Sequence, residues 1–508
     1  MSLALVVVLM LLALAAVVPF SSDALRRKVV DSLSDRFDGE VELAALTFHL
    51  FPRFHANGLG LTIRHKHRHD VPPLITVKSF TVDASLLGLL RKHVARVKLD
   101  GLDIEIPPGH NRDPEDPGTP RDQRDRNHDV RAIVVDHMVS NDARLVMISS
   151  KPDKASKVWA IHDLDMRSVS YDQPMPFVAT LTNGVPPGEI ETAGSFGPWQ
   201  SDDPGQTAVD GTFTFDRADL GVFKGIAGML SAHGTFGGSL ARIDILGETE
   251  TPAFSLAVGG QPVPLHTKYH AIVDGTSGDT QLARIDGAFL RSSLVAKGSV
   301  VDTPGIAGRT VTLDVTMDDA WIEDVLRLAV KAGTPPMTGM LKLTTTLVLP
   351  PGPQDVVNKL RLDGQFAVGI AKFTNLDVQK SVDELSHRGR GKTPDEKHES
   401  VVSDFNGRFK LAHGTLALTG LTFNVLGAGV NLAGSYGLQS EALDFRGTLL
   451  MDAKVSQTTT GFKRLLLKGV DPLFNKAGGG SAIPIKITGT RSDPSFGLDT
   501  GRVFKRSP

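Results

Sequence analysis

The sequence predicts a mainly β protein with an elongated, curved and largely antiparallel sheet that forms a hydrophobic groove. We also expect an N-terminal membrane-anchor helix and a few short amphipathic helices. Three observations lead there. Many short segments alternate apolar and polar residues between Gly and Pro, as in "VTLDVTMD" (311–318). Helical patterns are few. An uncharged run stands at the N-terminus. Period-2 alternation gives a strand one apolar and one polar face.

The uncharged run extends from Leu3 to Phe20, 18 residues without a charged or polar side chain. This length is at the lower limit for spanning a bilayer. We therefore expect residues 1–22 to be a transmembrane anchor or an uncleaved signal. The small residues Ser22 and Ala24 leave cleavage open as an alternative. The basic stretch at 26–28 follows the run and none precedes it, so a simple charge count would keep the remainder cytoplasmic.

After this run the sequence predicts one short helix and then strands. "SSDALRRKVVDSLSDRF" (21–37) has apolar residues at helical spacing and predicts an amphipathic helix. "GEVELAALTFHL" (39–50), "PLITVKSFTVD" (73–83) and "VARVKLDGLDIEI" (94–106) predict strands, because β-branched or alternating apolar residues lie between turn-forming residues.

A charged, proline-rich stretch then divides the predicted domains. Residues 107–129 have almost nothing to bury, so we place a solvated loop at 109–130, between an N-terminal region at 23–108 and a β-rich region at 131–508. Within the latter, "DDAWIEDVLRLAVKAG" (318–333) and "GFKRLLLKG" (461–469) predict helices that end at glycine. A second charged loop is expected at 386–400.

A short motif recurs at irregular spacing: a polar residue, Gly, any residue, then Phe. It occurs at 210–213, 233–236, 286–289, 363–366 and 406–409. We interpret the glycine as a turn or bulge where a strand begins, and the phenylalanine as the first buried residue of that strand.

Composition and motifs exclude several classes of function. The net charge is −2, from 55 basic and 57 acidic residues, so no basic field recruits nucleic acid. There is no cysteine for disulfides or thiolate metal sites. "RHKHRHD" (64–70) could place three imidazoles on one strand face, but its alternating cations disfavour a divalent ion and instead suit anionic headgroups. No nucleophile elbow, phosphate loop or zinc-protease motif occurs. We expect no enzyme activity, no cofactor and no metal.

Two stretches carry a family resemblance. "FPRFHANGLGLTI" (51–63) with "RVKLDGLDIEIPPG" (96–109) resembles the N-terminal region of AsmA-like proteins, and residues 404–499 resemble their C-terminal region. The resemblance implies an inner-membrane protein of diderm bacteria with a periplasmic body, related to chorein-like bridge proteins that pass phospholipids between membranes. The resemblance therefore predicts a periplasmic body, whereas the charge count alone would keep it in the cytoplasm. No catalytic residue is carried over.

One-faced strands that outnumber the covering helices must stack as a sandwich or curve into a groove that holds something apolar. We expect the groove, holding or conducting phospholipid for outer-membrane biogenesis. The alternative is a non-enzymatic scaffold that assists outer-membrane protein assembly; an envelope hydrolase is the weakest reading. The expected partners are phospholipid and the inner membrane, with outer-membrane or envelope assembly proteins as further candidates. The predicted lining residues are Val311, Leu313, Val315, Met317, Leu341, Leu343, Leu347, Leu349, Leu443, Phe445, Leu449 and Met451.

Overall fold

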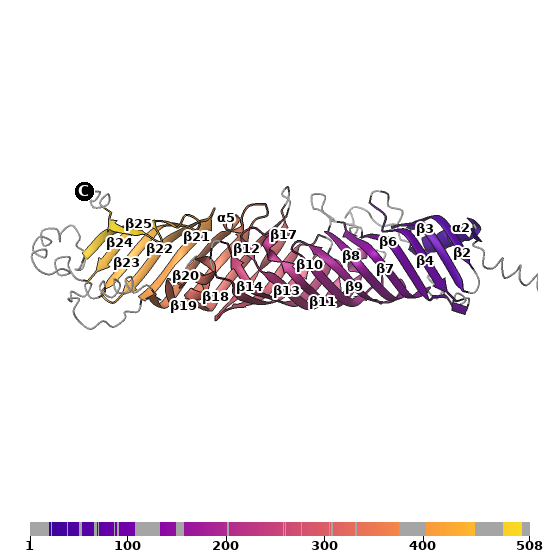
Figure 1. Ribbon diagram of the computed structural model, residues 1–508, viewed down its shortest axis with the longest axis horizontal. Helices are drawn as coiled ribbons and strands as arrows, with labels where there is room; N and C mark the ends of the chain where they lie inside the picture. Colours follow the sequence, from indigo (N-terminus) through magenta and orange to yellow (C-terminus); the bar gives the residue numbers. More distant parts are fainter. Residues whose placement is uncertain are drawn as a thin grey trace, which may run out of the picture. The chain divides into compact units, whose positions relative to one another are not determined.

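The computed structural model (Figure 1) describes residues 20–106, 133–148, 157–374, 386, 403–452 and 481–499, apart from short gaps within these ranges. The chain divides into two compact units. Unit 1 comprises Met1–Ala218, Ser231–Glu248 and His270–Gln281; unit 2 comprises Asp219–Leu230, Thr249–Tyr269 and Leu282–Pro508.

The described residues are mainly in strands, as predicted. The strands are β1 (Phe20–Ser21), β2 (Gly39–His49), β3 (Phe54–His65), β4 (Ile75–Ala84), β5 (His93–Val94), β6 (Arg96–Ile106), β7 (Val134–Met147), β8 (Lys157–Val169), β9 (Met175–Gly184), β10 (Pro187–Phe196), β11 (Ala208–Asp219), β12 (Ile226–Ala227), β13 (Met229–Ser239), β14 (Arg242–Leu256), β15 (Val263–Val273), β16 (Thr280–Phe289), β17 (Ser292–Asp302), β18 (Arg309–Trp321), β19 (Met337–Leu349), β20 (Arg361–Phe373), β21 (Ser403–Ala412), β22 (Thr415–Val425), β23 (Ala428–Gly437), β24 (Ala442–Met451), β25 (Ser481–Thr490) and β26 (Pro494–Leu498). The helices are α2 (Asp23–Phe37), α4 (Ile322–Ala329) and α5 (Val356–Lys359), with 3₁₀ turns η1 (Pro204–Gln206) and η2 (Leu220–Val222).

In unit 1, strands β2, β3, β4 and β6 pair antiparallel in that order, and β7 to β11 continue the ladder antiparallel. The join between them is different, because β6 and β7 are parallel, with Val97 opposite Met138. A parallel pair needs a crossover of a dozen or more residues, which accounts for a long connection between these strands. Both sides of the predicted loop at 109–130 thus belong to unit 1; the loop itself lies outside the described residues.

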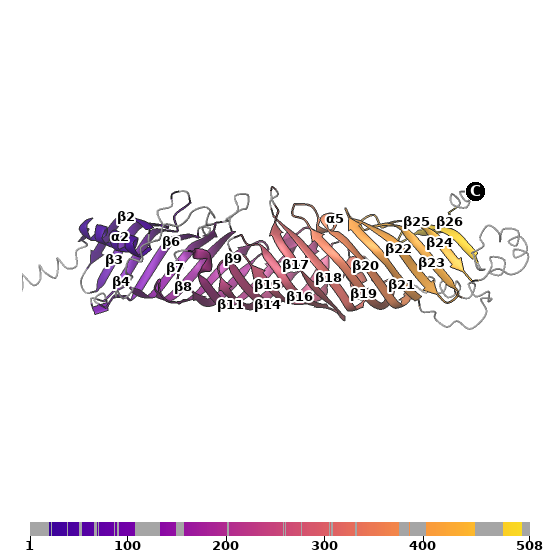
Figure 2. The same ribbon diagram turned by 180° about the vertical axis from the view of Figure 1, so that it is seen from behind.

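In unit 2, strands β17 to β26 pair antiparallel in sequence order. Figure 2 shows β17 to β23 side by side in this order. The predicted strand 311–318 lies within β18, whose neighbour is β19, with Val311 opposite Leu349 and Leu313 opposite Leu347. Directly opposed residues point to the same face, so the register gathers the apolar residues on one side of the sheet.

The sheet of unit 1 curls with its apolar face inward. Ile106 on β6 and Val209 on β11 belong to one buried cluster, together with Leu240. In a flat sheet five strand spacings would separate β6 from β11 by about 24 Å. The two cluster residues also lie at opposite strand ends, because Ile106 ends β6 and Val209 stands near the start of β11. One buried cluster that reaches from the end of β6 to the start of β11 fits a curled sheet. The predicted mainly β, curved and largely antiparallel architecture is therefore confirmed.

The helix α2 confirms the prediction for residues 21–37. It starts with Asp23, whose carboxylate suits the positive end of the helix dipole. Val29 and Val30 pack on a cluster that includes Leu43 and Leu46 of β2. The Arg26 guanidinium donates to the Leu43 carbonyl oxygen at 2.9 Å. The apolar face of the first strands is thus covered by this helix.

The helix predicted at 318–333 is shorter than expected. Residues 318–321 belong to β18, which continues past a bulge between Met317 and Ala320 to pair Trp321 with Met340. α4 occupies only Ile322–Ala329. The acidic residues that suggested a helix start lie on the exposed side of the strand end. Sheet pairing has therefore overridden the local helix signal in this segment.

The interpretation of the Gly-x-Phe motif was wrong for most of its glycines. Gly364 lies inside β20, and a Cβ there would come within 2.9 Å of the Phe409 Cζ. Likewise, a Cβ at Gly211 would lie 2.8 Å from the Phe236 ring, and a Cβ at Gly234 would lie 3.0 Å from the Phe213 ring. Each phenylalanine thus covers the glycine of a neighbouring strand. Gly407 does lie at a register shift, as a bulge would require.

No described helix is both long and apolar enough to span a membrane. The run from Leu3 to Phe20 lies outside the described residues except for Phe20, which pairs with Phe48 as part of β1. The predicted helix at 461–469 and most of the predicted charged loop at 386–400 also lie outside them.

Candidate functional site

The apolar face of unit 2 is the candidate site. Near the starts of β18 and β20 and the end of β19, its apolar side chains are only half-buried, although they point to the inward side of the sheet. On β21 the residues of this face, Leu411 and Phe409, are buried at 5% and 7% exposure. Partial exposure returns on β22 to β25. We call this set the half-buried strip. It consists of Val311, Leu313, Leu347, Leu349, Leu362, Leu416, Leu418, Tyr436, Leu443 and Ile487.

The other half of the face in β18 to β20 is closed by α4. Ile322, Val325 and Leu326 pack against a buried cluster that includes Met317 and Leu341. Met317 is 5% exposed and Leu341 1% exposed. The helix therefore takes the place that solvent or a ligand would otherwise occupy at this end of the strands.

The predicted lining residues all lie on this one face, but in different surroundings. Val311, Leu313, Leu347, Leu349 and Leu443 are in the half-buried strip. Met317 and Leu341 are covered by α4, and Val315 and Leu343 pack against the same cluster. Phe445 and Met451 are buried at 7% and 4% exposure, and Leu449 packs beside Met451. Val315, Leu343 and Leu449 are half-buried like the strip, but they differ from it because they pack against buried clusters.

Sequence reasoning missed an aromatic cluster on the same face. Phe366 lies 5.4 Å from Phe405 and 6.3 Å from Phe409, between ring centroids. Phe423 continues the row at 6.4 Å from Phe405 and 5.9 Å from Phe373. Phe366 and Phe409 come from two copies of the Gly-x-Phe motif, so pairing the motif copies on adjacent strands would have revealed the cluster. Rings in contact give this part of the face a large apolar area.

Two tyrosines of unit 2 have raised pKa values, and one of them, Tyr436, belongs to the strip. Burial raises the pKa of Tyr436 above its ordinary value of 10.0, and the Glu441 carboxylate raises it further, while the Arg491 guanidinium acts in the opposite direction. Arg491 also pairs with Glu441 at 3.0 Å. Burial likewise raises the pKa of Tyr269 on β15. Both phenols are thus held neutral by surroundings that disfavour charge.

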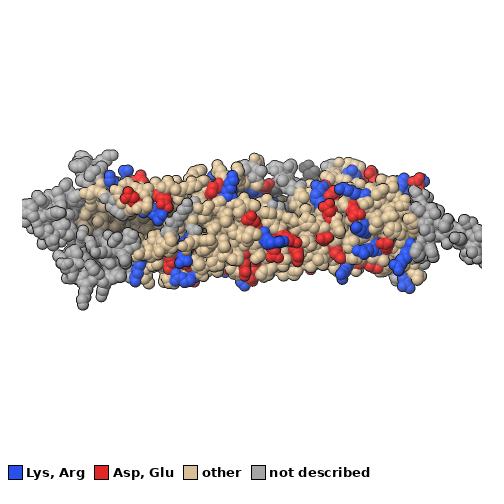
Figure 3. All heavy atoms as spheres, in the orientation of Figure 1, with Lys and Arg blue, Asp and Glu red and all other residues tan. Residues whose placement is uncertain are grey.

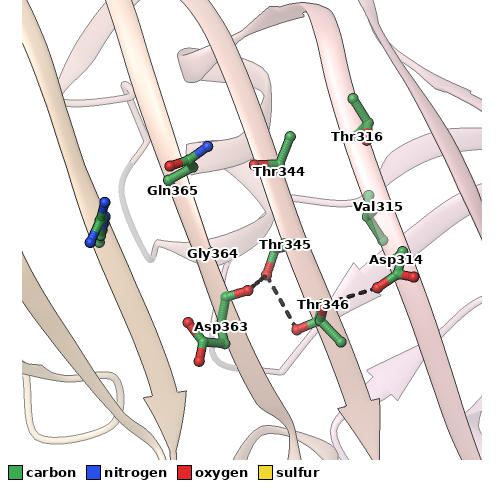
Figure 4. Close-up of a pocket in the computed structure, with 10 residues that line it drawn as sticks. Asp314, Val315, Thr316, Thr344, Thr345, Thr346, Asp363, Gly364 and Gln365 are labelled. Carbon is green, nitrogen blue, oxygen red and sulfur yellow. Dashed lines mark hydrogen bonds between the residues drawn. The ribbon is translucent and has the colours of Figure 1, made fainter.

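The opposite, polar face of unit 2 carries two shallow hollows. The first has a volume of about 450 Å³ and is lined by β18 to β21 (Figure 4). On this face Thr346 donates to the Asp314 carboxylate at 2.9 Å. Thr345 lies opposite Val315, so it belongs to the apolar face, and its hydroxyl donates to the Asp363 carbonyl oxygen at 3.2 Å. The second, of about 770 Å³, shares Thr344, Gln365 and Arg408 with the first. These groups form hydrogen bonds but include no thiol or imidazole that could act as a nucleophile or base.

Charge is dispersed on the surface that Figure 3 shows, where basic and acidic side chains are interspersed. No large field of one sign gathers there. This pattern is typical of a solvated face and does not indicate a polyanion site.

The described part of the chain contains no evident metal centre. No group of three or more His, Cys, Asp or Glu is arranged there to hold a metal ion. In the predicted cluster at 64–70, His69 lies 3.3 Å from the Glu40 carboxylate, while 66–68 are outside the described residues. His137 contacts Asp165 at 2.7 Å across neighbouring strands, which is an ordinary cross-strand pair.

No family model, no curated protein and no solved structure matches this chain.

Proposed function

We propose that this protein holds or conducts phospholipids, with their acyl chains lying in a groove along the apolar face of the sheet. The observation that carries the proposal is the half-buried strip. Residues such as Leu313 and Leu347 lie on the same face as the cluster beneath α4, yet they do not belong to that cluster and are only half-buried. A soluble protein rarely leaves a contiguous apolar surface uncovered unless something binds there.

An acyl chain is the occupant whose chemistry fits best. The strip contains aliphatic residues and one tyrosine, and no charged side chain belongs to it. Each methylene removed from water contributes about 0.8 kcal/mol. Ten methylenes laid on the strip would therefore contribute about 8 kcal/mol, before the cost of ordering the chain. A charged headgroup would stay at the strand ends, in water.

We also propose a cellular location and a protein family for this chain. An AsmA-like envelope protein anchored in the inner membrane by the run Leu3–Phe20, with a periplasmic body, would meet phospholipid at the bilayer it is anchored to. Lipid transfer of this kind needs no covalent chemistry, which agrees with the absence of catalytic motifs from the sequence.

The test compares one charge on the two faces of the sheet. In Leu313→Asp the carboxylate lies where acyl chains are proposed, and burying it against hydrocarbon costs several kcal/mol. In Thr344→Asp the same group lies on the exposed polar face. Val315 is a poorer choice than Leu313, because it packs against the α4 cluster. Phospholipid that co-purifies with the full chain is measured by mass spectrometry.

We expect the parent and Thr344→Asp to carry phospholipid and Leu313→Asp to lose most of it while it still unfolds cooperatively. Lipid-free parent protein would overturn the proposal and favour the scaffold for outer-membrane protein assembly. Equal lipid loading in all three proteins would show that the face around Leu313 does not line the lipid-binding site.

A further inference from the structure

A second feature of the same face is the short helix α4, which fills one half of it. α4 has eight residues, which gives a length of about 12 Å. Strands lie about 4.8 Å apart, so a helix of this length covers between two and three of them. The cluster beneath it includes Met317, Leu341 and Val368 of β18, β19 and β20, and it extends further to Val263 of β15 and Phe289 of β16.

The start of α4 is anchored by buried acidic groups. Asp324 is 3% exposed and accepts hydrogen bonds from the Arg291 backbone N–H at 3.1 Å and the Ser292 hydroxyl at 2.9 Å. Glu323 accepts from the Gly339 N–H at 3.1 Å and from the Arg291 guanidinium at 2.5 Å. Both carboxylates stand in the first turn, where the helix dipole favours them.

The end of α4 is held as well. The Gln261 backbone N–H donates to the Arg327 carbonyl at 3.2 Å. The Leu328 carbonyl oxygen lies so close to Gly259 that a Cβ there would stand 1.7 Å from it, so only glycine permits this approach. An isolated helix of this length is unstable in water, and these contacts at both ends supply what it lacks. α4 is therefore a fixed part of the fold.

We propose that α4 is a wedge that determines where acyl chains lie in unit 2. It excludes them from the ends of β18 and β20 and the start of β19, and confines them to the half-buried strip. The inference rests on the proposed lipid-binding function. The chemical reason is that α4 already removes the apolar surface around Leu341 from water, so acyl chains would bury no further surface there. Leu313 and Leu347 are only half-buried, so acyl chains can still remove their exposed surface from water.

The wedge also limits how many acyl chains the face can hold. The region under α4 offers apolar side chains to α4 that could instead contact a second row of acyl chains. Shortening the inward side chains of the helix should therefore open a new acyl position. Ile322, Val325, Leu326 and Leu328 are the helix residues that pack against the cluster, while Arg327 is exposed.

The experiment maps acyl contacts directly on native residues. The full chain is loaded with a phospholipid that carries a diazirine near the end of one acyl chain, irradiated and digested, and the labelled residues are identified by mass spectrometry. The variants are Val325→Ala/Leu326→Ala and the matched control Arg327→Ala. Native mass spectrometry of the same samples counts the lipids bound per chain.

In the parent and in Arg327→Ala we expect labels on Leu313, Leu347 or Leu349, and none on Met317, Leu341 or Leu343. In the double variant labels should appear under α4, and the number of bound lipids should rise. Labels under α4 in the parent would overturn the wedge and leave lipid binding intact. A parent with no label anywhere on the face would instead contradict the proposed function. If the double variant unfolds, the parent map alone still decides between these outcomes.

Discussion

At the scale of the residue, glycine and phenylalanine act as pairs between neighbouring strands. Gly364 and Phe409 lie on β20 and β21, and Gly407 and Phe366 form the reciprocal pair. The ring fills the space above a residue without a side chain, which protects the backbone and restores packing at a position that is otherwise weak in a strand. The motif in the sequence thus encodes contacts across the sheet.

We therefore predict that Gly364→Ala destabilises unit 2 by about 1 to 3 kcal/mol, because a Cβ there would lie 2.3 Å from the Thr344 carbonyl oxygen and 2.9 Å from the Phe409 ring. Gly369 on the same strand is the matched control, since a Cβ there meets nothing within 4 Å. Urea unfolding followed by Trp321 fluorescence, after Trp159 and Trp199 are changed to Phe, reports on unit 2. Equal midpoints for the two alanine variants would contradict the pairing.

Tyr436 gives a prediction on pH. Its pKa is raised in the folded protein above 10.0, chiefly by burial. The unfolded chain therefore loses the phenol proton first as pH rises. The contribution of Tyr436 to stability is complete below about pH 10 and is lost as pH rises through the folded pKa. Tyr436→Phe should show a smaller loss of stability between about pH 9 and about pH 11 than the parent does. Parallel pH profiles in urea unfolding would contradict this assignment.

At the scale of the element, α4 shows how a polar anchor fixes an apolar helix. Asp324→Ala leaves the Arg291 N–H and the Ser292 hydroxyl buried without this acceptor, and we expect a loss of about 3 kcal/mol in the free energy of unfolding. The exposed Asp319, at the end of β18, serves as the control, and its alanine variant should stay within about 0.5 kcal/mol of the parent. Urea unfolding measures both variants. A tolerated Asp324→Ala would mean that packing alone holds the helix.

At the scale of the whole molecule, the proposed N-terminal anchor gives a prediction on location. We predict that the intact chain fractionates with the inner membrane and that protease added from the periplasmic side digests the body, because the run Leu3–Phe20 is uncharged and long enough for a short span. A shorter, soluble periplasmic species would show instead that the run is cleaved as a signal peptide.

Residues 23–508, purified without detergent, should still carry phospholipid, because the half-buried strip lies entirely within them. Lipid analysis of this segment separates binding by the sheet from lipid held only around the anchor. A lipid-free and monodisperse segment would contradict the proposed site and would point to a scaffold.

The alternation of side chains in the sequence determined the strands and the face to which each residue belongs. "VTLDVTMD" places Val311 and Leu313 on the apolar side whatever the partner strand is, because the period of a strand is two. The helix α2 was likewise determined by its own apolar spacing. These are local properties, and each follows from the chain itself.

Only the tertiary structure decided what covers that face. Met317 and Val311 have the same pattern in the sequence, yet α4 buries Met317 and leaves Val311 half-buried. The cover depends on where a helix from the next segment docks and on hydrogen bonds between residues far apart, such as Ser292 and Asp324. The start of α4 moved for the same reason, because pairing of Trp321 with Met340 on β19 extended the strand into a segment that favours helix. Periodicity reports on neighbours within a strand, whereas burial depends on contacts that form only when the sheet curls and the helix packs into it.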